Sequence, residues 1–224
     1  WTLRIGLVDS QKYYVIRDIP LFLKVLVLRK SYMIGKHYEN DLSWDAFDTA
    51  SQEVLTFLCG LIEEGLSQDL FFPNQGRHLF FPLTFFEQGV ELLMNLEDFH
   101  FEHQIDSYEN LLFHDLDPDA ELFSFSVQEY PDYFEMEISE SERVNVFYGG
   151  AVLFHKGNLY LLNPKQISLL KEIKELPQEE KGRKWLQFDN SDRDRLAVCL
   201  PLFGQLGTVS APERLQIRAF SPIF

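Results

Sequence analysis

The stretch from residue 144 to residue 176 constrains the fold more than any other part of the sequence. Two apolar runs, residues 151–154 and 159–162, flank a Gly157-Asn158 pair, which accepts the positive φ angles of a tight hairpin turn. Because both runs are continuously apolar, we expect strands that are covered on two faces. Apolar residues then recur at helical spacing to the end of the stretch. The pattern predicts a hairpin followed by an amphipathic helix, and it contains no chemical motif.

The rest of the chain alternates between helical and strand-like patterns. Helices are expected at about residues 19–30, 44–64, 84–96 and 191–203, with caps at Asp18, at the pair Thr84 and Glu87, and at Ser191. Strands are expected at residues 3–7, 12–17, 70–72, 78–81, 215–219 and in several pieces of 99–148, and a charged loop at 178–184. Residues 31–38 are expected to form either a short strand pair or an irregular return. Since no βαβ rhythm occurs, the pattern predicts an α+β fold with mostly antiparallel sheet. Residues 1–224 are treated as one region with a possible subdomain boundary near residues 140–144.

Negative charge is concentrated in one part of the chain. The formal net charge is −15, and residues 78–142 hold 17 acidic residues but no Lys or Arg. A surface built from this segment would repel a phosphate backbone. Residues 97–142, called the acidic block below, form either a solvated surface or a contact for a basic protein partner.

Basic residues gather further along the chain. The candidates for nucleic-acid contact are Lys181, Arg183, Lys184, Arg193 and Arg195, together with Trp185. The basic side chains could bind phosphates and the indole could stack on a base. The alternative is an exposed loop and a charged helix face without a ligand.

Catalytic and metal-binding motifs were tested individually. The Asp115-Leu-Asp117-Pro-Asp119 run lacks the Gly and Glu that a calcium loop requires at later positions, where Ala120 and Ser126 stand. His100 and His103 would point to opposite faces of a strand, so a metal site that also used His114 is not favoured. The sequence contains no P-loop or nucleophile motif, and no spacing singles out two carboxylates for hydrolysis. We therefore expect no catalytic residue, no metal and no cofactor.

Two further features bear on the compartment. No apolar run approaches the roughly 20 residues that a membrane-spanning helix needs. Cys59 and Cys199 fall in apolar helical patterns, which favours buried thiols over a disulfide and suits a reducing cytoplasm. The chain begins with Trp1, which suggests a segment of a longer parent protein.

The order of several segments resembles the bacterial Swi/Snf-family helicase-associated region. The matching runs are LRIGL (residues 3–7), KYYVIRDIPLFL (12–23), YMIGK (32–36), the helix at 47–61, RHLFFP (77–82), the hairpin at 150–162, and residues 195–215. These motifs are structural, so their shared order carries the resemblance rather than any single motif.

The resemblance implies a non-catalytic accessory domain of a bacterial, cytoplasmic DNA-dependent ATPase. The partners that it implies are the ATPase motor domains of the same parent chain, an ATP-dependent helicase or translocase, with DNA or RNA contacted indirectly. Two alternatives stay open: a nucleic-acid-binding module that uses the basic residues near 181–195, and a carboxylate-based hydrolase.

Overall fold

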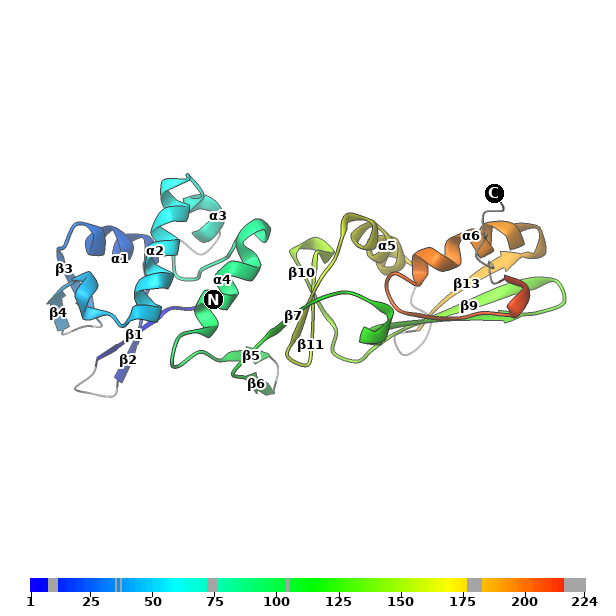
Figure 1. The fold of residues 1–224 in the computed structure, drawn as a ribbon, viewed down its shortest axis with the longest axis horizontal. Helices are drawn as coiled ribbons and strands as arrows, with labels where there is room; N and C mark the ends of the chain where they lie inside the picture. Colours follow the sequence, from blue (N-terminus) through cyan, green and yellow to red (C-terminus); the bar gives the residue numbers. More distant parts are fainter. Residues whose placement is uncertain are drawn as a thin grey trace, which may run out of the picture. The chain divides into compact units, whose positions relative to one another are not determined.

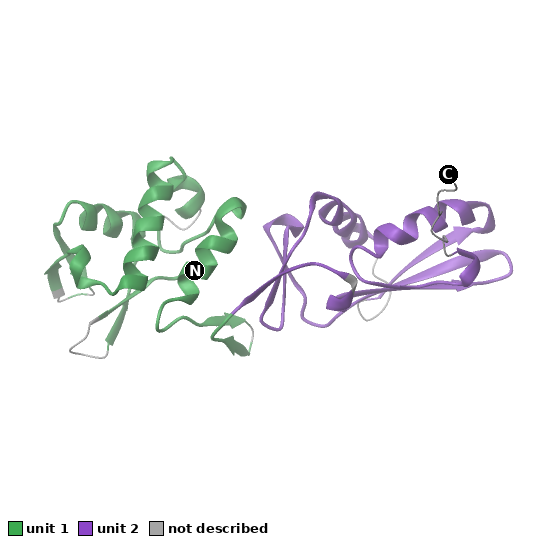
Figure 2. Cartoon of the chain, in the orientation of Figure 1, with its two compact units in different colours: residues 1–110 green, residues 111–224 purple. Residues whose placement is uncertain are grey.

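The computed structural model describes residues 1–7, 12–34, 36, 38–71, 76–103, 105–176 and 183–215 (Figure 1). The chain forms two compact units, unit 1 at Trp1–Asn110 and unit 2 at Leu111–Phe224 (Figure 2). Residues 140–144, where a boundary was considered, lie inside unit 2. Helices and mostly antiparallel strands are interspersed, so the predicted α+β class is confirmed.

Unit 1 combines helices with three separate two-stranded hairpins. Its helices are α1 (Ile19–Val27), α2 (Thr49–Glu63), α3 (Ser67–Phe71) and α4 (Phe86–Met94), with short 3-10 turns η1 (Trp44–Ala46) and η2 (Leu83–Phe85). The hairpins pair β1 (Arg4–Leu7) with β2 (Lys12–Val15), β3 (Ser31–Ile34) with β4 (Tyr38–Asp41), and β5 (Phe101–His103) with β6 (Asp106–Tyr108). The strand pair expected near residues 3–17 is therefore confirmed, and of the two alternatives for residues 31–38 the structure shows the strand pair.

Local side-chain chemistry explains where two of these helices begin. The Asp18 carboxylate accepts a hydrogen bond from the Leu21 backbone N–H at 2.8 Å, as the predicted cap requires. Asp48 caps α2 in the same way through the Ser51 N–H at 2.9 Å. The long helix expected from residue 44 is therefore divided, because the chain makes a 3-10 turn before Asp48.

Two predictions for unit 1 are wrong. Residues 70–72 and 78–81 were expected as strands, but Leu70 and Phe71 end α3 and residues 78–81 are not in a strand. The backbone of this segment forms isolated hydrogen bonds instead of a strand ladder, for example from the Phe80 N–H to the Leu70 carbonyl at 2.8 Å. The predicted capping box also fails, because Thr84 lies inside η2 and α4 begins at Phe86 without a side-chain cap.

Unit 2 is built on two four-stranded sheets. In the first the order is β10 (Asn145–Phe147), β11 (Val152–His155), β12 (Asn158–Leu161) and β7 (Leu112–Asp115). In the second, called the charged sheet below, the order is β13 (Lys184–Asp189), β9 (Tyr133–Glu140), β8 (Phe123–Glu129) and β14 (Thr208–Ser210). Only the β12–β7 and β14–β8 pairs of the described strands are parallel. The helices are α5 (Pro164–Glu175) and α6 (Arg193–Phe203), and η3 (Pro118–Ala120), η4 (Tyr148–Gly150), η5 (Asn190–Asp192) and η6 (Glu213–Leu215) are 3-10 turns.

The predicted hairpin and helix at residues 144–176 are confirmed, with the turn shifted by one residue. Lys156 and Gly157 have φ angles of 48° and 84°, so they form the turn, whereas Asn158 pairs with His155 inside the hairpin. Helix α5 begins at a capping box between Asn163 and Gln166. The Gln166 side chain is 5% exposed, and its Nε2 also donates to the carbonyls of Leu116 at 3.0 Å and Gln205 at 2.7 Å.

One face of the charged sheet is apolar and covered. Alternate residues such as Phe125, Phe134 and Met136 are almost fully buried, and they join the core with side chains from α5 and α6. Figure 1 shows α6 lying along β13 and β9. This amphipathic arrangement leaves the other face of the sheet to polar side chains.

Three predictions near the C-terminal end need correction. Strand β13 begins at Lys184, where a charged loop was expected, and residues 177–182 of that loop lie outside the described residues. Helix α6 begins at Arg193, so Ser191 lies in η5 rather than at the cap, and Pro201 stands inside the helix, which ends at Phe203. Of the expected strand at 215–219 only Leu215 is described, and it ends η6.

Candidate functional site

The predicted basic cluster is divided between the two ends of β13. Arg183, Lys184 and Trp185 lie at its start, whereas Arg193 and Arg195 begin α6 after its end. At about 3.3 Å per residue, the strand separates these two groups by roughly 20 Å. Lys181 lies outside the described residues. The structure therefore does not bring the candidate residues together into one phosphate-binding patch.

The residues at the start of β13 have structural partners. Arg183 forms an ion pair with Glu137 of β9, with 3.1 Å between Nη1 and Oε1. The Lys184 ammonium donates to three carbonyls at the end of α5, those of Ile173 at 2.6 Å, Lys174 at 2.9 Å and Leu176 at 2.9 Å. Lys184 therefore caps α5, where the helix dipole also favours a cation.

The environment of Lys184 also changes its acid–base behaviour. Burial is the main cause that lowers the pKa of its ammonium group, and the neighbouring Lys174 charge acts in the same direction. Glu140 opposes both effects. The group nevertheless has three carbonyl acceptors, so its charge is used inside the unit rather than presented to a ligand.

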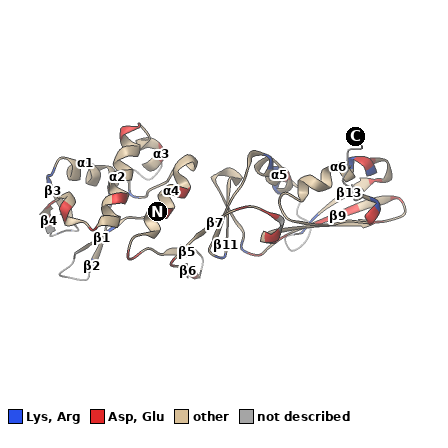
Figure 3. Cartoon of the chain, in the orientation of Figure 1, with Lys and Arg blue, Asp and Glu red and all other residues tan. Residues whose placement is uncertain are grey.

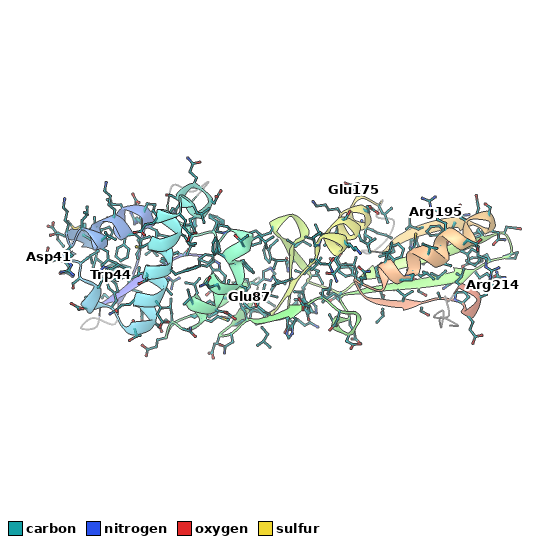
Figure 4. All side chains as sticks on the ribbon, turned by 45° about the horizontal axis from the view of Figure 1, so that its top comes forward. Asp41, Trp44, Glu87, Glu175, Arg195 and Arg214 are labelled. Atoms are coloured by element: carbon teal, nitrogen blue, oxygen red, sulfur yellow. The ribbon has the colours of Figure 1, made fainter. Side chains whose placement is uncertain are left out.

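At the other end of β13, one arginine is hydrogen-bonded within the unit and another is exposed to solvent. The Arg193 guanidinium donates to the Arg214 carbonyl at 3.1 Å. Arg214 forms an ion pair with Glu129 and lies over the Phe134 ring, 5.4 Å from its centroid. Arg195 is exposed on the outer side of α6 (Figure 4). Trp185 is half-buried and stands opposite Glu137 in the strand register, so a carboxylate adjoins the position where a base would stack.

The acidic block is divided between the two units. Residues 97–110 belong to unit 1 and residues 111–142 belong to unit 2. Within unit 2, Glu140 accepts a hydrogen bond from Lys174 at 2.7 Å. Glu129 and Glu137 also pair with basic side chains, so three glutamates of the block have partners from later in the sequence. Figure 3 shows acidic and basic residues side by side around β9, β13 and α6. The charge segregation in the sequence is therefore partly cancelled by folding.

Exposed acids of the block remain between β7 and β8. Asp115, Asp119 and Glu121 are exposed and take part in none of the ion pairs found among the described residues. Asp117 accepts a hydrogen bond from the Ala120 N–H at 3.1 Å, which stabilises the η3 turn. We call residues 115–121 the acidic turn.

The histidines considered as metal ligands contact other side chains. His100 lies 3.6 Å from the Glu102 carboxylate, and the His103 ring stacks on Phe101. His114 shares a 3.0 Å hydrogen bond with the Asn158 side chain. Across the described ranges no three His, Cys, Asp or Glu side chains are placed to hold a metal ion. Cys59 and Cys199 are free thiols, half-buried rather than fully buried.

Sequence reasoning missed the pairing that organises the charged sheet. The alternation in Lys184–Asp189, with Leu186 and Phe188 on one face, is a strand signal that could have been found. Nothing local to Lys184 indicates three carbonyl acceptors, because their positions depend on where α5 ends.

No helix in the described part of the chain is long and apolar enough to cross a membrane.

A comparison with protein families identifies the group to which this chain is similar. Residues 77–224 match the family described as bacterial SNF2 helicase associated, a region that contains all of unit 2 and the last part of unit 1. No curated protein and no solved structure matches the chain significantly. The match begins at Arg77, so the similar runs at residues 3–36 and the helix at residues 47–61 lie outside it. Because the match covers well over half of the sequence, the chain belongs to the bacterial SNF2 helicase-associated family.

Proposed function

We propose that this chain is a non-catalytic accessory domain that modulates a bacterial SNF2-type DNA-dependent ATPase. The observation that carries the proposal is the family match over residues 77–224. Charged side chains of the charged sheet support the non-catalytic part of the proposal, because they form ion pairs and cap a helix. The motor domains of the parent, a helicase or translocase of the bacterial cytoplasm, would then supply ATP hydrolysis.

The acidic turn is the part of unit 2 that best suits a basic partner. Its exposed carboxylates are not neutralised by ion pairs among the described residues, in contrast to Glu129 of β8 and to Glu137 and Glu140 of β9. A basic DNA-binding cleft of the motor, or another basic protein, would be electrostatically complementary to it. If the turn occupies that cleft in place of DNA, it holds the motor at a low basal rate.

The test measures ATP hydrolysis by the motor portion, with and without this chain, across a DNA titration. We expect the chain to change the basal or the DNA-stimulated rate. A triple variant, Asp115→Asn, Asp119→Asn and Glu121→Gln, should weaken this effect while keeping Asp117 in its turn. An unchanged rate at every DNA concentration would contradict the proposal that this domain modulates the motor.

A matched control is needed, because removing three negative charges changes the whole chain. Glu53→Gln, Glu102→Gln and Asp132→Asn remove the same charge from exposed positions outside the acidic turn. Deleting residues 97–142 would not be informative, because it removes β8 and β9 from the charged sheet. The control variant should regulate the motor as the natural chain does.

The two alternative functions have less support. Direct nucleic-acid contact near residues 181–195 would require Arg183, Lys184 and Arg193 to leave their partners. A carboxylate-based hydrolase would need two carboxylates facing one substrate, but Glu129, Glu137 and Glu140 each face a base.

A further inference from the structure

Unit 1 contains a locally basic segment, although the chain as a whole is acidic. Residues 1–38 hold seven Lys or Arg and only two acidic residues, whereas the whole chain has a net charge of −15. This segment includes β1, β2 and β3 and precedes the family match. A local excess of positive charge attracts phosphate even when the net charge of the protein is negative.

The hairpin β1–β2 presents arginine and an aromatic ring on one face. Arg4 pairs with Val15 and Gly6 pairs with Tyr13, so these side chains share a face of the hairpin. All of this face is exposed, with Tyr13 at 56% and Val15 at 42%, and Arg17 is exposed further along the chain. The Tyr13 ring lies across Gly6, where an added Cβ would come within 2.9 Å of the ring. The missing side chain therefore lets the ring lie against the strand.

A shallow groove beside β3 is a separate feature, because it is lined by Ile5 and Tyr14 from the opposite face of the hairpin and by neither Arg4 nor Tyr13. It has a volume of about 120 Å³ and is lined by the basic residues Arg17 and Lys36 and by Tyr14, Tyr32 and apolar side chains. This volume is below the roughly 300 Å³ that small-molecule sites need, so the groove does not enclose a metabolite. None of the ion pairs in the described parts of the chain involves Arg4, Arg17 or Lys36.

Acidic groups border this surface on two sides. The Asp98 carboxylate is hydrogen-bonded to the Tyr13 hydroxyl, which raises the pKa of Tyr13, and Glu97 is close by. Asp18 lies near Tyr32, but its carboxylate caps α1. A phosphate backbone would therefore follow Arg4 and Arg17 and avoid the hydroxyl end of Tyr13.

We propose that this face of the hairpin, defined by Arg4, Tyr13 and Arg17, binds single-stranded nucleic acid. Guanidinium groups would bind the phosphates, and the exposed ring would stack on an unpaired base. A duplex would satisfy the cations but would keep its bases away from the ring. The inference is independent of the accessory role proposed above, because it concerns a surface outside the family match.

The test is fluorescence anisotropy of a labelled oligothymidine of about 16 nucleotides, titrated with the whole chain between about 50 and 200 mM salt. We expect the dependence of log K on log salt to flatten by about 1.4 in Arg4→Gln/Arg17→Gln, since each single-strand phosphate contact contributes about 0.7. Tyr13→Ser should weaken binding about tenfold without changing that slope. Asp98→Asn should strengthen binding, because it removes a negative charge beside the ring.

Controls separate this surface from general charge effects. Arg193→Gln/Arg195→Gln removes the same charge from unit 2 and should leave affinity and slope unchanged. Arg4→Lys/Arg17→Lys should keep the slope, and circular dichroism should show that all variants are folded. The proposal is overturned if the natural chain does not bind the oligonucleotide, if both double Gln variants lose binding equally, or if duplex DNA binds as tightly as the single strand.

Discussion

In unit 2, acids and bases that lie far apart in the sequence meet across one sheet, whereas in unit 1 Arg4, Arg17 and Lys36 make no ion pair among the described residues. The pairs Glu137–Arg183 and Glu140–Lys174 join β9 to the start of β13 and to α5. A net charge of −15 describes neither arrangement. The neighbours that a charged side chain meets in the folded protein, rather than the composition of the chain, therefore decide whether that side chain can bind a ligand.

The two units also differ in how their strands are supported. A two-stranded hairpin is at best marginally stable in water, so the hairpins of unit 1 depend on packing against the helices. Ile16 and Ile34, at 4% and 2% exposure, anchor the first two hairpins to that core. The charged sheet instead has four strands and a covered apolar face. Unit 1 therefore leaves strand faces available to a ligand, while unit 2 uses strand pairing to build its core.

The largest expected effect tests whether the two units are separately stable. Phe125 is 1% exposed in β8, and its ring centroid lies 5.0 Å from that of Phe203 in α6. Phe125→Ala should destabilise unit 2 by about 3–5 kcal/mol through lost burial and a residual cavity. Hydrogen exchange should lose protection across unit 2 and keep it in unit 1. Equal loss in both units would show that they unfold together.

A smaller effect is expected for the ion pairs of the charged sheet. A double-mutant cycle with Glu137→Gln and Arg183→Gln should give a coupling free energy of about 0.5–1 kcal/mol, because the Arg183 side chain is 59% exposed. The coupling should shrink in high salt. A matched cycle with Glu137→Gln and Arg195→Gln should give no coupling, because α6 packs on the opposite face of the sheet from Glu137. Coupling of equal size in both cycles would contradict the pairing of Glu137 with Arg183.

The smallest effect concerns stability at alkaline pH. Burial raises the pKa of Tyr148 to about 12 from an ordinary value of 10.0. The folded state therefore keeps a proton that the unfolded state loses, and stability falls as pH rises from about 10 to about 12. Tyr148→Phe should reduce this fall in denaturant unfolding measured across that range. The change should be small because the residue is 40% exposed, and an identical pH profile would refute it.

Much of the local structure follows from short patterns in the sequence. The hairpin β11–β12 follows from two apolar runs around a Gly, and the start of α1 follows from Asp18. The errors occur where one sequence pattern is compatible with two backbone conformations of similar free energy. Lys156 could adopt a positive φ angle, so the turn moved by one residue, and Thr84 entered a 3-10 turn before α4 began.

The sequence by itself determined the α+β class, the hairpin followed by helix α5 and the resemblance to the family, because these depend on periodicity and on the order of segments. Only the tertiary structure decided what the charges do. Lys184 became a cap because α5 ends beside β13, and Arg183 acquired a partner because β13 pairs with β9. Glu137 and Arg183 are 46 residues apart in the sequence, so no local pattern encodes their contact.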